Sequence, residues 1–83
     1  MTLLYFAWVR QKIGKSEEAM ALPAGVATAA YLIAHLRRLG PGYVDAFADE
    51  SRIRIAINQK HSRSDTAVAA NDEVAFFPPV TGG

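Results

Sequence analysis

The sequence predicts a single α+β domain in which one sheet packs over one main helix. Several segments alternate apolar and polar residues with the period of two that is typical of strands, whereas residues 28–38 have the 3.6-residue period of a helix. These segments follow one another as strand, strand, helix, strand, an optional short strand and a last strand. That order lets the first and last strands lie side by side in a mixed sheet of four to five strands. A chain of 83 residues has room for one such domain.

Two strands are predicted in the N-terminal part. The first is residues 3–9, a run of aliphatic and aromatic side chains. Alternation divides this run between the two faces of the sheet, with Leu4, Phe6 and Trp8 on one face and Leu3, Tyr5, Ala7 and Val9 on the other. Apolar side chains on both faces indicate a central strand, or one whose second face meets a partner. Gly14 suits a turn with positive φ, and residues 16–22 predict a weaker second strand.

The main helix is predicted to begin after Thr28, whose hydroxyl can accept a hydrogen bond from an otherwise unpaired backbone N–H. One apolar stripe follows at helical spacing, formed by Ala29, Leu32, Ile33 and Leu36. Gly40 followed by Pro41 is a stop signal. Residues 40–51 show no pattern that assigns them a structure.

The C-terminal half predicts further strands. Residues 52–58 alternate, so Ile53, Ile55 and Ile57 are expected on a buried face. Residues 58–65 predict a hairpin-like loop that can hold a short strand, and residues 71–77 the last strand. The element order is that of a β-grasp domain over residues 1–79, with residues 80–83 as an extended tail. We expect the three isoleucines, the helix stripe and Val74 to form one core.

Composition excludes several classes of function. Hydrophobic residues make up 51% and charged residues 20%, as in soluble globular proteins, and a formal charge of +1 gives no general attraction to nucleic acid or membrane. No apolar run approaches the ~20 residues that span a bilayer, and the N-terminus lacks the basic region of a signal peptide. The cytoplasm is therefore predicted. The sequence has no cysteine, so any sulfur chemistry needs sulfur from outside the chain.

Conventional catalytic groupings are missing from the sequence. His35 and His61 lack metal-ligand spacing, the serines lack a Gly-x-Ser-x-Gly elbow, and there is no glycine-rich phosphate loop. The adjacent acidic pairs, Glu17–Glu18 among them, are interpreted as solvated faces. Four basic residues either flank the exit of the tail or serve as solubilising surface charge: Arg10, Lys12, Lys60 and Arg63.

The C-terminal segment 76–83, FFPPVTGG, carries the most specific chemistry. Phe76 and Phe77 point to opposite faces, so one is core and the other is either covered by a loop or exposed as an interaction anchor. Pro78 and Pro79 end the strand and direct an extended chain away from the domain. Two glycines without Cβ atoms can then thread a narrow channel. The reactive group is the terminal carboxylate, which resists nucleophiles until it is activated, most naturally as an acyl-adenylate.

The segment NDEVAFFPPVTGG resembles the C-terminal signature of the molybdopterin synthase small subunits (MoaD), a family of ubiquitin-like sulfur carriers. Similarity extends through AINQ at residues 56–59, the helix TAAYLIAHL and the opening LLYFAWVR, and so covers nearly the whole chain. One departure lies before the last strand, where the family often has Asp-Gly-Asp-Glu and this chain has Asn71 in place of the glycine. Asparagine tolerates left-handed φ, so the turn is expected to persist.

The resemblance implies that Gly83 is the reactive terminus, with Gly82 beside it. An E1-like adenylyltransferase (MoeB-like) uses ATP to form a glycyl adenylate, and sulfur then replaces the nucleotide to give 1-thioglycine, a thiocarboxylate. No bound cofactor or metal is implied. The tail enters the large synthase subunit (MoaE-like), which supplies the acid–base groups in a heterotetramer, and sulfur passes to cyclic pyranopterin monophosphate. Eight residues are expected to bind partners: Phe76, Phe77, Pro78, Pro79, Val80, Thr81, Arg10 and Lys60.

Three alternatives to this hypothesis stay open at the level of sequence. The same terminus suits a sulfur carrier for thiazole or another metabolite. It also suits a ubiquitin-like protein modifier that forms isopeptide bonds with lysines. The last alternative is an interaction domain with a passive tail.

Overall fold

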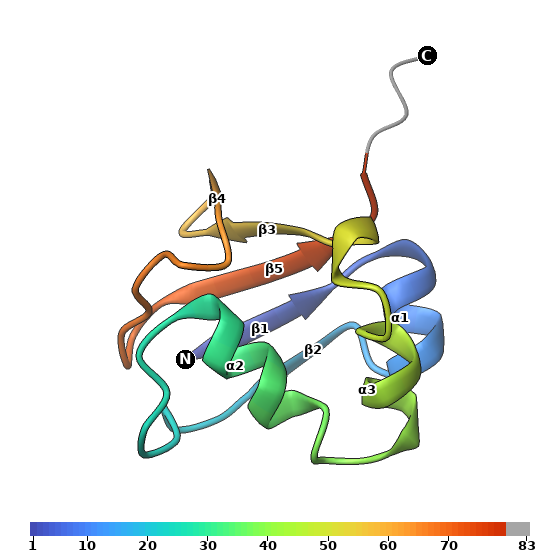
Figure 1. Cartoon of the computed structure of the whole chain (residues 1–83), viewed down its shortest axis with the longest axis horizontal. Coiled ribbons are helices and arrows are strands. Elements are labelled where there is room, and N and C mark those ends of the chain that lie inside the picture. Colours follow the sequence, from blue (N-terminus) through green and yellow to red (C-terminus); the bar gives the residue numbers. More distant parts are fainter. Residues whose placement is uncertain (80–83) are drawn as a thin grey trace.

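A computed structural model describes residues 1–79 and arranges five strands in one mixed sheet, in the order β2-β1-β5-β3-β4 (Figure 1). The strands are β1 (Thr2–Tyr5), β2 (Glu17–Ala19), β3 (Arg54–Ile57), β4 (Lys60–Ser62) and β5 (Glu73–Phe77). The neighbours β1 and β5 are parallel, and the other neighbouring pairs are antiparallel. The prediction that the first and last strands lie side by side is confirmed.

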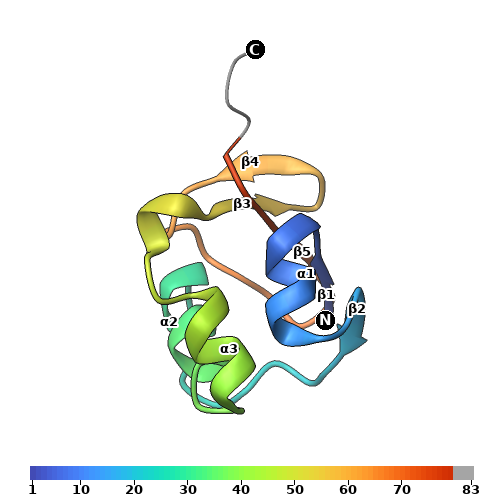
Figure 2. The same cartoon turned by 90° about the vertical axis from the view of Figure 1, so that its right-hand side faces the viewer.

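Helices cover one side of this sheet. They are α1 (Ala7–Ile13), α2 (Ala29–Leu36) and α3 (Pro41–Ala46), with a 3-10 turn at Glu50–Arg52. Figure 2 shows α2 and α3 together on one side of the strands, and Figure 1 shows α1 at the end where β1 and β5 finish. The opposite side of the sheet carries no helix from residues 1–79.

The core lies between α2 and the sheet, as expected. Ile53, Ile55, Ile57 and Val74 are buried in one cluster with the stripe of α2. The predicted N-cap is also confirmed, because Thr28 Oγ1 accepts a hydrogen bond from the Tyr31 N–H at 3.4 Å. The predicted hairpin contains a two-residue turn at Asn58 and Gln59, both with positive φ, as a type I′ turn requires.

The prediction for residues 3–9 is wrong beyond Tyr5. The strand ends there, and Ala7 takes a φ of +54° as the chain turns into α1. Phe6 is consequently exposed, while Val9 reaches the core from a helix rather than a strand. A dense apolar run fits both the strand and the helix period, so alternation could not locate this boundary. Gly14 does have positive φ, at +88°, but as the C-cap of α1.

Residues 40–51, for which no structure was predicted, form α3 and the 3-10 turn. Pro41 stands at the first position of α3, where its missing N–H has no helical partner to lose. Tyr43, Ala46 and Phe47 are buried, at the i, i+3, i+4 spacing of one helix face. The Gly-Pro pair therefore separates two helices rather than leading into a loop.

The two short helices α1 and α3 approach each other closely at Gly42. A Cβ atom at this residue would lie 2.5 Å from the Lys12 carbonyl oxygen and 3.4 Å from Ile13 Cα. Backbone atoms are the obstacle, so no side chain can rotate away to make room. Glycine at position 42 therefore sets how closely α3 packs against α1.

Candidate functional site

The candidate site is the C-terminal end of β5, where the chain leaves the domain. This strand lies between β1 and β3, and the registers place Tyr5 beside Phe76 and Arg54 beside Phe77. Pro78 and Pro79 follow, both half-buried. The predicted tail residues Val80, Thr81, Gly82 and Gly83 lie outside the described residues.

Phe76 fixes the end of the last strand in the core. Its side chain is 0% exposed, it stacks on the Tyr5 ring with centroids 6.0 Å apart, and it meets the Phe47 ring edge-on at 5.1 Å. The prediction that one of the two phenylalanines is core is confirmed for Phe76. The tightly packed part of the domain thus extends to Phe76, three residues before Pro79.

Phe77 points to the other side of the sheet, where it is half-buried. The His61 ring from β4 meets it edge-on, with centroids 5.6 Å apart. Strand β4, not a loop, therefore provides part of its cover. Phe6 lies close by, since its N–H donates to the Phe76 carbonyl at 3.1 Å, and its side chain is 47% exposed.

The side of the sheet that carries Phe77, here called the open face, has an apolar centre. One cross-strand row runs through Glu17, Leu4, Ala75, Ala56 and His61. The two adjacent alanines have short side chains in the middle of this row, and the larger side chains of Leu4 and Phe77 are their neighbours. An apolar strip with polar ends is a surface that suits a protein partner.

Glu18 forms a polar cluster on the helix side of the sheet. Its Oε2 atom accepts hydrogen bonds from the hydroxyls of Tyr5 at 2.7 Å and Tyr43 at 2.8 Å, and its Oε1 atom lies 3.2 Å from Lys15 Nζ. The Glu18 side chain is only 15% exposed, so its interpretation as part of a solvated face is wrong. Alternation in β2 turns it inward, opposite to Glu17.

The pKa values of this cluster follow from its geometry. Partial burial by itself would raise the pKa of Glu18, but the hydrogen bonds from Tyr5, Tyr43 and Lys15 outweigh it and lower that pKa. Burial, reinforced by the bond to the carboxylate, raises the pKa of Tyr5 and of Tyr43. The cluster therefore holds one carboxylate and two protonated phenols at neutral pH, as a structural support for the strand beside β5.

The predicted basic residues are spread over the surface. Arg10 is exposed on α1, and Lys60 is exposed on β4. Lys60 is paired with Ile57, and Ile57 is paired with Val74. Lys60 therefore lies at the other end of β5 from Phe77. The roles of Arg10 and Lys60 in binding stay predictions. Two other arginines were not selected by the sequence analysis: Arg54 is paired with Phe77 at the end of β5, and the Arg52 guanidinium lies 5.5 Å from the Trp8 ring centroid. The strand alternation could have identified Arg54, because it shares a face with Phe77.

Within residues 1–79, no group of three or more histidine, cysteine, aspartate or glutamate side chains is placed to hold a metal ion. No helix in this part of the chain has the length and apolar character needed to cross a membrane.

A family model described as the ThiS family matches residues 3–83. The chain belongs to the ThiS family. It is 39% identical over 83 residues to the molybdopterin synthase sulfur carrier subunit of Haemophilus influenzae, covering 100% of this chain and 99% of the relative. The subunit of the same name from Escherichia coli is 36% identical over 81 residues, with 98% and 96% covered, and that from Dictyostelium discoideum is 36% identical over 83 residues, with 98% and 93% covered.

Solved structures of similar proteins agree with the fold. A putative molybdopterin converting factor, subunit 1, from Pyrococcus furiosus superposes with a TM-score of 0.74 at 31% identity, with 95% of each chain covered. SAMP1 from Haloferax volcanii superposes with a TM-score of 0.73 at 26% identity, covering 100% of this chain and 98% of that one. The ubiquitin-like β-grasp prediction is confirmed.

Proposed function

We propose that this chain is the sulfur-carrier subunit of molybdopterin synthase. The observation that carries the proposal is identity of 36–39% along the full chain to three proteins with that name. The C-terminal sequence VTGG, which follows β5 after Pro78 and Pro79, gives the proposal its chemistry.

Gly83 is the residue that carries sulfur. An E1-like enzyme joins the terminal carboxylate to the adenylyl group of ATP and releases pyrophosphate. A sulfur nucleophile then attacks the acyl carbon and expels AMP, which leaves a thiocarboxylate. The sequence contains no cysteine, so the terminus is the place where this chain holds reactive sulfur.

The chain acts as a donor and not as a catalyst. The thiocarboxylate sulfur attacks cyclic pyranopterin monophosphate in the active site of the large subunit, which supplies the acid and base groups. The five residues from Pro79 to Gly83 span at most about 16 Å. A domain docked at the mouth of the large subunit can therefore place its terminus inside a channel while the β-grasp core stays outside. Two small subunits on a dimer of large subunits form the heterotetramer, in the cytoplasm.

The open face supplies the docking surface. Phe77 and Leu4 lie on it beside the exit of the tail, with the exposed Phe6 at its edge. Aromatic side chains are enriched at the centres of protein interfaces. Docking here fixes the distance between the partner and the point where the tail begins.

Intact mass of the chain tests the first half of this function. Co-expressed with its activating enzyme, the chain should gain about 16 Da through exchange of one oxygen for sulfur, confined to the C-terminal peptide. The thiocarboxylated protein, mixed with the large subunit and cyclic pyranopterin monophosphate, should then yield molybdopterin. Absence of the mass shift under conditions that convert the Escherichia coli relative would refute the proposal.

Protein modification is a second candidate function. It is favoured by the match to SAMP1, which is described as small archaeal modifier protein 1 and aligns with 96–100% of this chain at 26% identity. Immunoblots that show a ladder of conjugates dependent on Gly83 would support it. A thiazole carrier is the remaining possibility within the ThiS family, and sulfur transfer to a thiazole synthase instead of the pterin would identify it.

A further inference from the structure

A cleft of about 490 Å³ with two arginines in its wall lies between α2, the turn at Glu50–Arg52 and the strands β3 and β4. Its apolar floor contains Ile33, Ile53 and Ile55, and the Arg54 and Arg63 side chains line it together with three serines and one acidic residue, Glu50. Ile33, Ile53 and Ile55 belong to the core between α2 and the sheet, so the cleft opens on the helix side. Arg54 lines the cleft and is also paired with Phe77 across β3 and β5, so it stands between the cleft and the open face.

The Arg54 guanidinium is held in place by the backbone. Its Nη1 atom donates to the carbonyl oxygens of Ser51 at 3.1 Å and Ile53 at 3.4 Å. A guanidinium has five N–H donors, so these two contacts leave donors for another molecule. Because the side chain is already held in one position, less conformational entropy is lost when a partner binds it.

The positive charge of this wall is only partly compensated within residues 1–79, by Glu50 in the lining and by Asp65. The ion pairs found there are Lys15–Glu18 and Arg63–Asp65, and neither involves Arg54. Arg63 and Asp65 are 3.4 Å apart with side chains 86% and 72% exposed. A pair so exposed is worth little, so Arg63 is free to exchange Asp65 for another carboxylate.

We propose that this cleft receives an acidic segment of the large synthase subunit, whose carboxylates bind Arg54 and Arg63 while Phe77 docks next to them. The inference rests on the proposed function. The relatives are named as subunits, so their lasting partner is the other part of the synthase, and a lasting interface covers more surface than the tail alone. The cleft thereby selects the cognate large subunit, because a neutral or basic segment would leave the guanidinium groups desolvated and unpaired.

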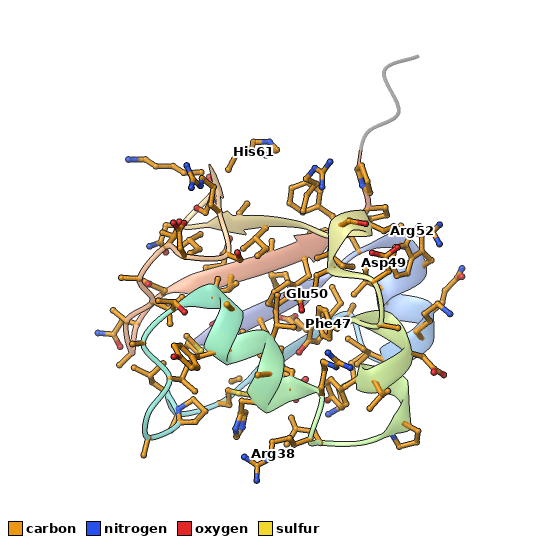
Figure 3. All side chains as sticks on the ribbon, in the orientation of Figure 1. Arg38, Phe47, Asp49, Glu50, Arg52 and His61 are labelled. Carbon is orange, nitrogen blue, oxygen red and sulfur yellow. The ribbon has the colours of Figure 1, made fainter. Side chains whose placement is uncertain are left out.

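Affinity for the purified large subunit tests the proposal, with Arg54→Glu, Arg54→Met and Arg63→Glu compared to wild type. Arg54→Met keeps the length of the side chain and removes its charge. Arg38→Glu is the matched control, because Arg38 is exposed and does not line the cleft, and Figure 3 shows it at the opposite side of the view from His61. Both reversals in the cleft should raise Kd at least tenfold and flatten its dependence on salt, with melting temperatures near wild type, whereas Arg38→Glu should leave Kd unchanged.

Several outcomes would overturn the assignment. An unchanged Kd in the Arg54 and Arg63 variants would show that the large subunit does not bind the cleft. An equal increase of Kd in all charge reversals, including Arg38→Glu, would show the same. A wild-type chain that dimerises through Arg54 would assign the cleft to a second copy instead. Thiocarboxylate formation by the activating enzyme is measured on the same variants. If a variant still forms the thiocarboxylate but no longer binds the large subunit, the proposal is supported. If every variant loses thiocarboxylate formation, the cleft belongs to the complex with the activating enzyme instead.

Discussion

The rings of Tyr5 and Phe76 stack with centroids 6.0 Å apart and planes 16° from parallel. The two residues are also register partners in the parallel pair β1–β5. Through its hydroxyl, Tyr5 extends this contact to Glu18 on β2. Phe76 on β5 is therefore connected across three strands to a partly buried carboxylate, and the end of β5 is fixed by the core rather than by the surface.

Replacing Glu18 should destabilise the fold, because two tyrosine hydroxyls would lose a charged acceptor. Glu18→Ala should lower the free energy of unfolding by about 2–3 kcal/mol, and Glu18→Gln by about 1 kcal/mol, since an amide oxygen still accepts. Lys15→Ala is the control and should leave the free energy of unfolding close to that of wild type, as the Lys15 side chain is 50% exposed. Urea denaturation measures all three, and equal stability of Glu18→Ala and wild type would contradict the role of the cluster.

The same carboxylate predicts a pH dependence. Its pKa in the folded state is below the ordinary glutamate value of 4.5, so the folded state binds the proton less readily than the unfolded state. The stabilisation is complete above pH 4.5 and is lost as the pH falls through the folded pKa. Asp49 and Asp72 also have lowered pKa values, so the contribution of Glu18 is the difference between wild type and Glu18→Gln. That difference should shrink below pH 4.5, and a constant difference would show that the carboxylate is not preferentially ionised in the fold.

The two adjacent phenylalanines should separate folding from binding. Phe76→Ala opens a cavity in the core and should cost about 3–5 kcal/mol of unfolding free energy, a large share of what so small a domain has. Phe77→Ala should leave the fold intact and weaken binding to the large subunit by about 1–3 kcal/mol. Thermal melts and calorimetric titration distinguish the two variants. If Phe77→Ala binds the large subunit with normal affinity, the open face is not part of the interface.

Gly42→Ala tests the close approach of α1 and α3. Alanine favours an exposed helix by about 1 kcal/mol over glycine, but here its Cβ would meet the Lys12 carbonyl oxygen at 2.5 Å. We expect the clash to prevail and the variant to lose about 1–3 kcal/mol. Gly40→Ser is the matched control, because its Cβ would meet only Tyr43 at 3.9 Å and serine is a good N-cap. A more stable Gly42→Ala protein would refute the steric argument.

Sequence patterns predicted the elements whose signals are local. Ile53, Ile55 and Ile57 reveal one strand face directly, and α2 begins at a clear N-cap. The parity of β5 even decides which phenylalanine is core, because Val74 and Phe76 are two residues apart and share the buried face. In contrast, α1 depends on a positive φ at Ala7, which alanine disfavours, and on contact with α3 thirty residues later. Glu18 could not be recognised either, since its partner Tyr43 is 25 residues away.

The final prediction concerns the terminal glycines. If the terminus enters narrow sites on two successive enzymes, deletion of Gly83 shortens its reach by about 3.3 Å and moves the carboxylate out of register. A misplacement of that size at a reacting centre can cost about 10²-fold in rate or more. Gly82→Val should be nearly as harmful, because a β-branched side chain fills the channel and restricts the backbone.

Both positions follow β5, which ends at Phe77, so melting temperatures should hardly change. Ala70→Val, at an exposed turn before β5, is the control and should keep full activity. Thiocarboxylate formation and then molybdopterin synthesis are measured for each protein. Sulfur transfer at the normal rate by the Gly83 deletion would show that the terminus is not the carrier.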